Sequence, residues 1–271
     1  MVVTGCSSGL GRTIAFRLGE AGWRVFATAR TDADLKSLVD AGLQAVRLDL
    51  ASSEMVGRAA SEILEKTEGR IDALVNNAAV GQLEAVEDLT RGEMRELFET
   101  NVFGTIELTN LFFPAFRRQR RGRIVFISSV CGRVSLPYFG NYSASKFALE
   151  ALVDALRRET RETGVGIQLI EPGMFQSRMF ERSKSSFERK AASRAMVHAE
   201  RCSKRLALME QEHSGIPEGR SVLIADAAIA FLQGKNDAAR KIVPHSAAVY
   251  ELARRFLPDK LLDRLVEARR G

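Results

Sequence analysis

Cysteine is scarce in this chain of 271 residues, and Cys6, Cys131 and Cys202 are odd in number and far apart. Such a set predicts neither a disulfide framework nor a metal site, and it suits a reducing cytoplasm. No apolar run approaches the roughly 18 to 20 residues that a membrane-spanning helix needs. The pattern of a secretory signal, a charged stretch followed by an apolar core, is also missing. We therefore expect a cytoplasmic protein without a bound metal.

Repeats, low-complexity linkers and an obvious domain boundary are missing as well. With 45% hydrophobic and 27% charged residues, the composition is globular, and we expect a single domain over residues 1–271. The net charge is +6, but the basic residues are spread out with few aromatic residues between them. This distribution argues against binding of nucleic acid.

Seven short runs rich in apolar residues alternate with longer segments that have helical spacing of apolar residues. The predicted strands are Val2–Thr4, Arg24–Ala29, Ala45–Leu48, Ala73–Asn76, Arg123–Ser128, Gly166–Ile170 and Lys241–Val243. Such alternation is typical of a parallel sheet that is covered on both sides. We therefore expect a Rossmann-type α/β fold, a doubly wound and mostly parallel seven-stranded sheet with helices on both faces.

The stretch from Met174 to Gly215 is different, because it is poor in strand formers and holds nine Lys and Arg against five Asp and Glu. We expect residues 174–215 to form a substrate-loop insertion within the domain, followed by a final helix and strand. Its basic residues either form a solvated helical face or bind an acidic or phosphorylated substrate or a membrane surface. Its apolar residues are suited to wall a lipophilic pocket: Met174, Phe175, Met179, Phe180 and Phe187.

A glycine-rich turn follows the first predicted strand, with the spacing T-G-x-x-x-G-x-G from Thr4 to Gly11. Glycine allows a sharp bend and lets a phosphate approach the backbone closely. A helix that begins near Gly9 offers unpaired N–H groups to an anion, and Ser7 and Ser8 add hydroxyl donors. The turn therefore predicts a site for the pyrophosphate of a dinucleotide, the alternative being a purely structural turn.

The second predicted strand ends in Arg30, with Asp32 two residues beyond. In units that bind NAD an acidic residue usually ends this strand and holds the ribose hydroxyls. A guanidinium instead binds a 2′-phosphate. We therefore expect NADP(H) to be preferred over NAD(H), the alternative being a solvated arginine and a preference for NAD.

Tyr142 and Lys146 are four residues apart and share one face if a helix begins near Tyr142. A lysine cation near a phenol lowers the phenol pKa from about 10 toward working pH, so that it can exchange a proton with a carbonyl or an alcohol. Tyrosine and lysine also occur at this spacing by chance. Ser129, however, ends an apolar strand, where α/β sheets place their ligands, and can donate a hydrogen bond to a substrate oxygen.

Two asparagine positions complete the candidate set. Asn101 lies in a helical stretch, where it is either functional or an ordinary polar or capping residue. Residues Asn76–Ala79 close another strand, which by itself indicates no more than a turn.

Taken together, these motifs resemble the short-chain dehydrogenase/reductase family, in its compact single-domain branch. The matches run in order as Thr4-Gly5-x3-Gly9-x-Gly11, Asp49, Asn76-Asn77-Ala78, Asn101, Ser129, Tyr142-x3-Lys146 and Pro172-Gly173. The resemblance implies that Tyr142 exchanges the proton, Ser129 orients the substrate oxygen, Lys146 lowers the tyrosine pKa and holds the nicotinamide ribose, and Asn101 anchors a water in a proton relay.

The resemblance also implies a dinucleotide that supplies or accepts the hydride. The residues expected to bind it are Gly5, Ser7, Ser8, Gly9, Leu10, Gly11, Arg30, Asp49, Leu50, Asn76, Ala78, Tyr142, Lys146, Pro172 and Gly173. Two features depart from the family pattern. Ala79 stands where the family usually has glycine, and Met1 lies almost inside the first strand.

Within the family, the stretches "GCSSGLGR", "VFATAR" and "YSASKFALEAL" are most similar to 17β-hydroxysteroid and retinol dehydrogenase-like enzymes. This similarity implies an NADP(H)-dependent oxidoreductase that interconverts a ketone or aldehyde and an alcohol on a steroid-, retinoid- or lipid-like substrate. The alternatives are an NAD-dependent dehydrogenase of a small or acidic substrate, another reaction on the same scaffold such as epimerisation or dehydration, and a non-catalytic nucleotide-sensing protein.

The family resemblance also implies a homodimer or homotetramer. The tail from Glu251 to Gly271 interleaves leucines with charges. This pattern predicts a helix packed on its own domain or, alternatively, one that contacts a partner subunit or a membrane surface.

Overall fold

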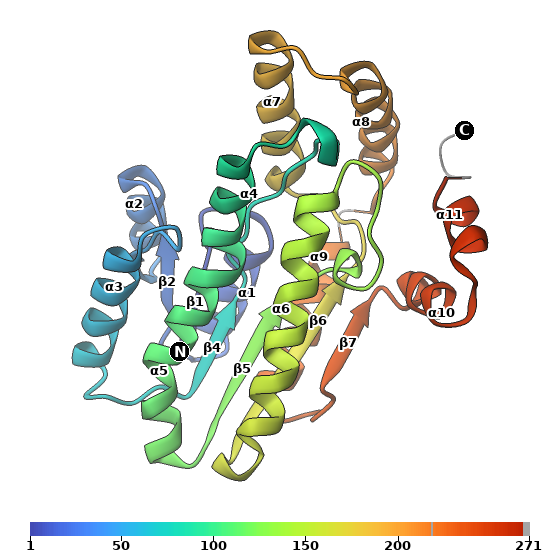
Figure 1. Cartoon of the computed structure of the whole chain (residues 1–271). Helices are drawn as coiled ribbons and strands as arrows, with labels where there is room; N and C mark the ends of the chain where they lie inside the picture. The colour runs from blue at the N-terminus through green and yellow to red at the C-terminus, as the bar shows by residue number, and fades with distance from the viewer. Residues whose placement is uncertain (218, 268–271) are drawn as a thin grey trace.

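The computed structural model describes residues 1–217 and 219–267, and its centre is a parallel sheet in the order β3-β2-β1-β4-β5-β6-β7 (Figure 1). Every paired neighbour runs parallel. The strands are β1 Val2–Val3, β2 Phe26–Ala29, β3 Gln44–Arg47, β4 Ala73–Asn76, β5 Gly122–Ile127, β6 Val165–Pro172 and β7 Arg240–Val243. The predicted sheet is confirmed, and the strand ends differ from the prediction by two residues at most.

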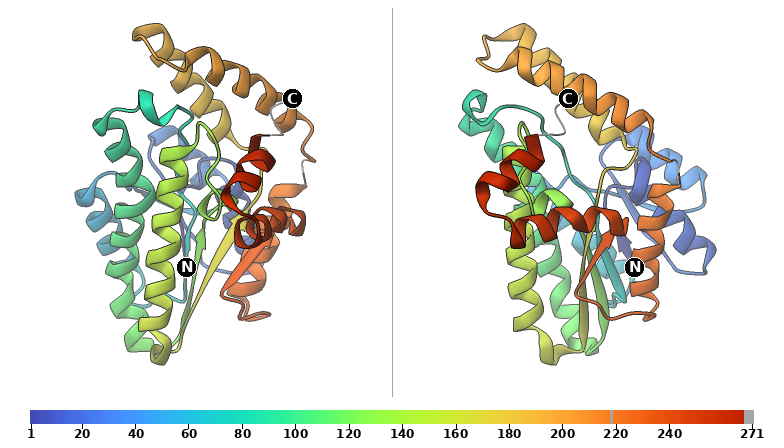
Figure 2. Two further views of the ribbon diagram at one scale, coloured as in Figure 1. Left: turned by 45° about the vertical axis from the view of Figure 1, so that its right-hand side comes forward. Right: turned by 90° about the vertical axis from the view of Figure 1, so that its right-hand side faces the viewer.

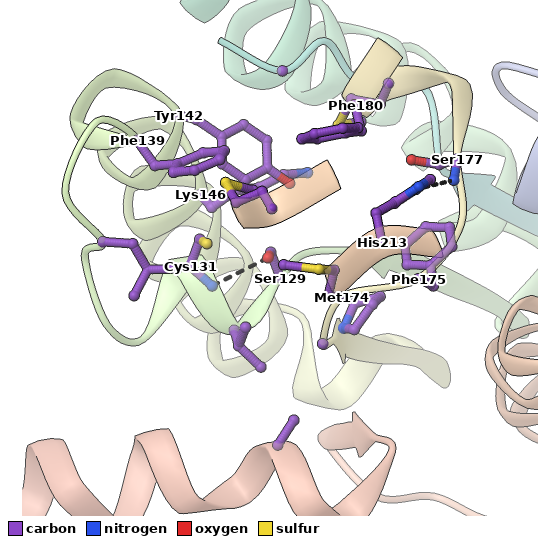
Figure 3. A pocket seen from close by; sticks show the side chains of 18 of the residues that line it. Ser129, Cys131, Phe139, Tyr142, Lys146, Met174, Phe175, Ser177, Phe180 and His213 are labelled. Carbon is purple, nitrogen blue, oxygen red and sulfur yellow. Dashed lines mark hydrogen bonds between the residues drawn. The ribbon is translucent and has the colours of Figure 1, made fainter. Parts of the chain in front are cut away.

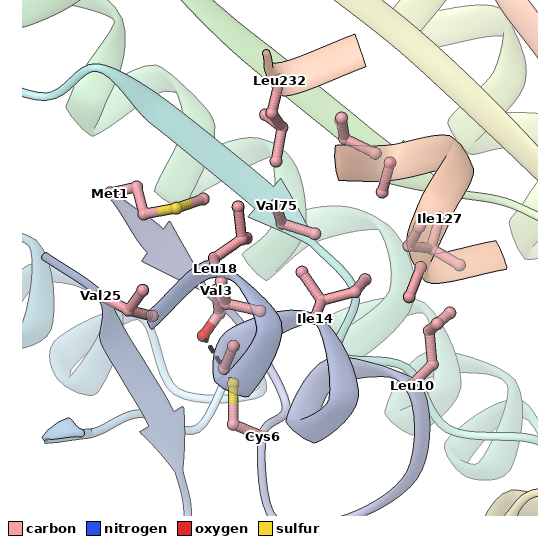
Figure 4. Packing of buried hydrophobic residues seen from close by; sticks show 14 of the residues in the cluster. Met1, Val3, Cys6, Leu10, Ile14, Leu18, Val25, Val75, Ile127 and Leu232 are labelled. Carbon is pink, nitrogen blue, oxygen red and sulfur yellow. Dashed lines mark hydrogen bonds between the residues drawn. The ribbon is translucent and has the colours of Figure 1, made fainter. Parts of the chain in front are cut away.

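Helices cover both faces of the sheet, as predicted. Their bounds are α1 Gly9–Glu20, α2 Asp32–Asp40, α3 Ser53–Lys66, α4 Arg91–Phe98, α5 Gly104–Gln119, α6 Gly140–Glu159, α7 Arg178–Ser193, α8 Ala199–Ser214, α9 Arg220–Leu232, α10 Ala248–Phe256 and α11 Asp259–Glu267. Successive side chains of a strand point to opposite faces. Val3 therefore packs with α1, α2 and α9 (Figure 4), and Val2 packs with α3, α5 and α6 on the other side.

The order of the strands reverses between β1 and β4, since the chain first builds outward to β3 and then returns to the other side of β1. At such a point the connections diverge and leave a crevice at the carboxyl ends of the strands. The segments that follow β1, β4, β5 and β6 all emerge at this edge (Figure 1). The fold thus brings together the predicted motifs of the first 173 residues.

Residues 174–215 form a pair of helices, α7 and α8, that lie across the carboxyl edge of the sheet (Figure 2). They enclose a third apolar cluster that includes Phe187, Cys202 and Leu206. The helix and strand expected after this insertion are α9 and β7, and α10 and α11 come after β7. Pro258 separates these two helices, and the residue before a proline is held in the extended region, as Leu257 is.

The tail predicted as one helix over residues 251–271 is therefore two helices, and its residues 268–271 lie outside the described part of the chain. Within residues 1–217 and 219–267, no helix combines the length and apolar character that would let it cross a bilayer.

A buried ionic cluster joins α6, β6 and β7 on the side of the sheet away from β3. Arg240 contacts Glu150 (3.2 Å), Glu171 (3.2 Å) and Asp154 (2.7 Å). Glu171 is completely buried, and burial raises its pKa to about 7, with the neighbouring charge of Glu150 acting in the same direction. One arginine thus faces three carboxyl groups, and burial makes ionisation of Glu171 costly.

Neutralising Glu171 is expected to stabilise the protein at alkaline pH. Because its folded pKa lies above the ordinary value of 4.5, the stability it contributes is complete below that value and is lost as pH rises through about 7. Glu171→Gln should therefore raise the free energy of unfolding, relative to the parent, by roughly 1–3 kcal/mol more at pH 8 than at pH 5. Urea denaturation at both pH values measures this difference.

Asp154→Asn is the matched control, because the same arginine holds the pKa of Asp154 below its usual range against the effect of burial. This substitution should destabilise the protein at pH 8. An effect of Glu171→Gln that is independent of pH would contradict the assignment.

Candidate active site

The glycine turn packs directly against the segment that follows β4. Gly5 and Gly9 have positive φ angles of 72° and 58°, a region that favours glycine. A Cβ atom at Gly5 would lie 2.8 Å from the Cα atom of Ala78, and one at Gly11 would collide with the Gly5 carbonyl oxygen. The spacing of the motif is therefore required both by the bend and by the contact between the ends of β1 and β4.

Thr4 and Asn77 fasten this contact with hydrogen bonds. The hydroxyl of Thr4 accepts from the backbone N–H groups of Asn77 and Ala78, both at 2.9 Å. The side-chain amide of Asn77 in turn donates to the carbonyl of Thr4 at 2.9 Å and to that of Gly5 at 3.3 Å. The predicted Asn76 points elsewhere and donates to Thr109 at 2.9 Å, where it supports the sheet. Asn77 lines the cavity of Tyr142 described below.

Asn101 lies in a π-helical turn, Glu99–Phe103, that interrupts the helical run from α4 to α5. Single π turns within helices are frequent at functional sites because they redirect side chains. The Asn101 amide accepts from the N–H of Val80 (2.8 Å) and donates to the Val80 carbonyl (2.9 Å) and to Ser145 (3.2 Å). Asn101 therefore joins the segment after β4 to α6, while its predicted contact with a water stays a prediction.

Ser129, Tyr142 and Lys146 meet at one cavity of about 610 Å³ (Figure 3). Ser129 follows β5, and its hydroxyl accepts from the N–H of Cys131 at 3.1 Å. Lys146 lies one turn after Tyr142 on α6, with its Nζ atom 5.8 Å from the centre of the tyrosine ring. The same Nζ donates to the carbonyl of Ile127 at 2.9 Å. Pro172 and Gly173 also line this cavity, as the sequence predicts for a common site.

Burial shifts the pKa values of both titratable groups toward their neutral forms. It lowers the pKa of Lys146 to about 8, against opposing effects of Glu150 and Cys131. It raises the pKa of Tyr142, as does the proximity of Cys131, and a hydrogen bond with Ser129 offsets only part of this rise. The net shift of the tyrosine pKa is upward because loss of solvation outweighs the other effects, and the expectation that Lys146 lowers this pKa stays a prediction. The phenol is thus set up as a proton donor.

A second cavity, of about 820 Å³, lies between the glycine turn and α7. Ser7, Ser8 and Gly9 line one side, and Gln176, Ser177 and Arg178 line the other. The N-terminus of α1 opens here, and its free N–H groups favour an anion.

The adenine end of the predicted dinucleotide site falls at the tips of β2 and β3. Arg30 is exposed at the end of β2, and its carbonyl accepts from Arg47 at 2.8 Å. Arg47 also forms an ion pair with Asp32. Asp49 accepts from the N–H of Ala51 at 3.1 Å, while the side chain of Leu50 is buried in the core. These residues flank the two cavities rather than line them.

Ion pairs anchor the α7–α8 pair to the segment before α4. Glu84 is almost fully buried and binds Lys190 at 2.7 Å as well as Arg194. Lys190 also binds Glu93 at 2.6 Å. A buried carboxylate held by two cations fixes the orientation of the helices over the cavity.

The sequence did not identify Ser177 and His213, although both residues line both cavities. Ser177 lies four residues after Gly173, so its closeness to the Pro172-Gly173 motif was a signal in the sequence that could have identified it. His213 is forty residues from Gly173 and belongs to no motif, so only the fold reveals its position.

Comparisons with known proteins agree with this geometry. The family model for short chain dehydrogenases matches residues 1–187. The uncharacterized oxidoreductase YbbO of Escherichia coli K12 is 40% identical over 178 residues, which span 66% of each chain. The 17-beta-hydroxysteroid dehydrogenase type 6 of Rattus norvegicus is 38% identical over 197 residues, or 69% of this chain and 62% of its own length. The match thus spans slightly less than two thirds of these relatives.

A crystal structure of a short-chain dehydrogenase from Streptomyces avermitilis has the same fold, with a TM-score of 0.79 and 31% sequence identity. The alignment covers 98% of this chain and 94% of that one. The sheet order, the family-model match over residues 1–187 and these relatives lead to one conclusion: the chain belongs to the short-chain dehydrogenase/reductase family of NAD(P)-dependent oxidoreductases.

Proposed function

We propose that this protein is an NADP(H)-dependent oxidoreductase that interconverts a ketone or aldehyde and an alcohol on a hydrophobic substrate. The observation that carries the proposal is the convergence of Ser129, Tyr142 and Lys146 on one cavity with largely apolar walls. The alternative of a non-catalytic nucleotide sensor predicts the loss of a catalytic group, yet Asn101 and these three residues are all present.

The cavity residues suit the proton half of the reaction. A bound nicotinamide supplies a hydride to the carbonyl carbon in reduction, or accepts one from the alcohol carbon in oxidation. Tyr142, which burial keeps protonated, then donates its hydroxyl proton to the carbonyl oxygen. The Ser129 hydroxyl accepts from the Cys131 N–H, so its own hydrogen can turn from Tyr142 to donate to that same oxygen. Lys146, protonated at neutral pH, favours the phenolate that remains.

The cavity walls favour an apolar substrate over an acidic one. Phe139 and Met179 are among the side chains that line the chamber, together with Phe180 (Figure 3). Many of the basic residues that the sequence left open form ion pairs with acidic neighbours instead. These pairs are Lys184–Glu210, Lys190–Glu84, Arg194–Glu84, Lys204–Glu200 and Arg205–Glu212. The rat relative, by its name, is a hydroxysteroid dehydrogenase, which supports a steroid-, retinoid- or lipid-like substrate.

The preference for NADP(H) is supported by the charge at the tips of β2 and β3. Asp32 is the acidic residue nearest Arg30 in sequence, and it is paired with Arg47. The Asp32 carboxylate therefore does not neutralise the positive charge of the Arg30 guanidinium. An exposed arginine in this position favours a 2′-phosphate.

Exposed apolar side chains on α5, α6 and the π turn before α5 support the homodimer or homotetramer that the family resemblance implies. Phe103, Leu111, Phe147 and Leu152 are 40–53% exposed on these elements. Exposed apolar side chains of this size, gathered on one face, mark contact surfaces between proteins.

The three cysteines are free and buried, which fits the reducing cytoplasm expected from the sequence.

Tyr142→Phe is expected to abolish turnover, at least about a thousandfold in kcat, because it removes the proton donor but keeps the ring. Steady-state assays that follow NADPH absorbance with a panel of steroid, retinoid and aliphatic ketones measure this loss. Binding of NADPH, followed by fluorescence titration, should stay within about threefold of the parent. Tyr138→Phe is the matched control, since Tyr138 lies outside the residues that line the cavity. Turnover by Tyr142→Phe at the parent rate would end the catalytic assignment.

Arg30→Ala is expected to weaken binding of NADP by about tenfold or more and to leave NAD almost unaffected, because a charge-assisted hydrogen bond to phosphate is lost. Dissociation constants of both dinucleotides, measured by calorimetry, report this change. Arg58→Ala serves as a control, because Arg58 is exposed on α3 and pairs only locally with Glu54. Tighter binding of NAD than of NADP by the parent protein would refute the preference.

A further inference from the structure

The segment that follows β6 is tied to the region where α8 ends and α9 begins. Arg220 donates to the carbonyl of Met174 at 2.8 Å, and Gln176 donates to the carbonyl of Ile216 at 3.0 Å. The backbone N–H of Ser177 donates to the Nε2 atom of His213 at 3.1 Å. Three hydrogen bonds thus fix a stretch of four residues, Met174–Ser177, that has no regular secondary structure of its own.

His213 is held in a defined orientation by a second contact. Its ring stacks on Phe180, with ring centres 5.0 Å apart and an interplanar angle of 23° (Figure 3). Nε2 accepts the hydrogen bond from the Ser177 N–H, so the ring acts as a hydrogen-bond acceptor at this contact.

Ser177 and His213 together form the partition between the two cavities, because both residues line the chamber of Tyr142 and also the groove at the glycine turn. Ser177 is the N-cap residue of α7, and its own side chain makes no capping hydrogen bond. The contact that ties this residue to α8 is the hydrogen bond that its N–H donates to His213. Across the groove lie Ser7, Ser8 and Gly9, so the position of Ser177 sets the width of the groove.

We propose that His213 is a positioning residue that, through its hydrogen bond with the Ser177 N–H, holds the Met174–Ser177 segment as the wall of the dinucleotide groove. The imidazole touches neither the reacting carbon nor the proton donor in this role. Its contribution is to the affinity for the dinucleotide, because a segment that is already in place does not have to be ordered on binding. This inference rests on the proposed binding of NADP(H).

Two substitutions separate the hydrogen bond from the packing of the ring. His213→Phe keeps an aromatic ring to stack on Phe180 but removes the acceptor. His213→Gln keeps an acceptor of similar reach but loses the ring. Thermal denaturation of each variant first establishes that it is folded.

The first readout needs no dinucleotide. Hydrogen–deuterium exchange of peptides that contain Ser177, measured on the free protein, should be about fivefold to tenfold faster in His213→Phe and within about twofold of the parent in His213→Gln. The second readout is the dissociation constant for NADPH by nicotinamide fluorescence. It should rise by about fivefold to tenfold in His213→Phe and recover to within about twofold in His213→Gln.

Unchanged exchange and unchanged affinity in His213→Phe would overturn the proposal. Equal losses in the two variants would overturn it too, because packing of the ring and not the hydrogen bond would then be responsible. If the parent itself failed to bind NADPH, the proposed function and the claim about affinity would fall, whereas exchange at Ser177 would still test the hydrogen bond separately.

Discussion

The contact between the ends of β1 and β4 is the constraint on which the rest of the site depends. These two strands lie side by side where the strand order reverses, and the segments that leave them must diverge. The Thr4 hydroxyl and the Asn77 amide close the gap with four short hydrogen bonds to backbone groups. The glycine turn is thereby pressed against Ala78, and the N–H groups at the amino end of α1 favour an anion.

Burial dominates the electrostatics around the cavity. Tyr142, Lys146 and Glu171 lie in a region from which water is largely excluded, and each has a pKa shifted toward its neutral form. The cost of this desolvation is offset only in part by Arg240 and by backbone carbonyls such as that of Ile127. Titratable side chains with strongly shifted pKa values are common at catalytic sites, because a small change in their surroundings then changes their protonation.

The α7–α8 pair combines two kinds of contact with separate consequences. Ion pairs of Lys190 and Arg194 with Glu84 fix it to the segment before α4, and the pair Lys184–Glu210 joins the two helices to each other. Its apolar residues, among them Met179 and Phe180, face the cavity. A segment that looks strongly basic in the sequence therefore also presents an apolar surface to the cavity of Tyr142. Ser177 and His213, near its two ends, line both this cavity and the one at the glycine turn.

The sequence by itself determined the sheet, the glycine turn and the trio of Ser129, Tyr142 and Lys146. These are local features, in which strand and helix periodicity, glycine conformation and the spacing of four residues along a helix leave few alternatives. It did not show what depends on the surroundings. The pKa of Tyr142 rises because neighbouring protein removes solvent, and the break at Pro258 divides a tail that looked like one helix.

Only the tertiary structure decided which basic residues of 174–215 are paired, that Asn77 and not Asn76 faces the cavity, and that His213 meets Ser177. The physical reason is the same in each case. Ion pairs, solvent exclusion and hydrogen bonds between distant segments depend on separations in space, which the folded chain sets and the order of residues does not express.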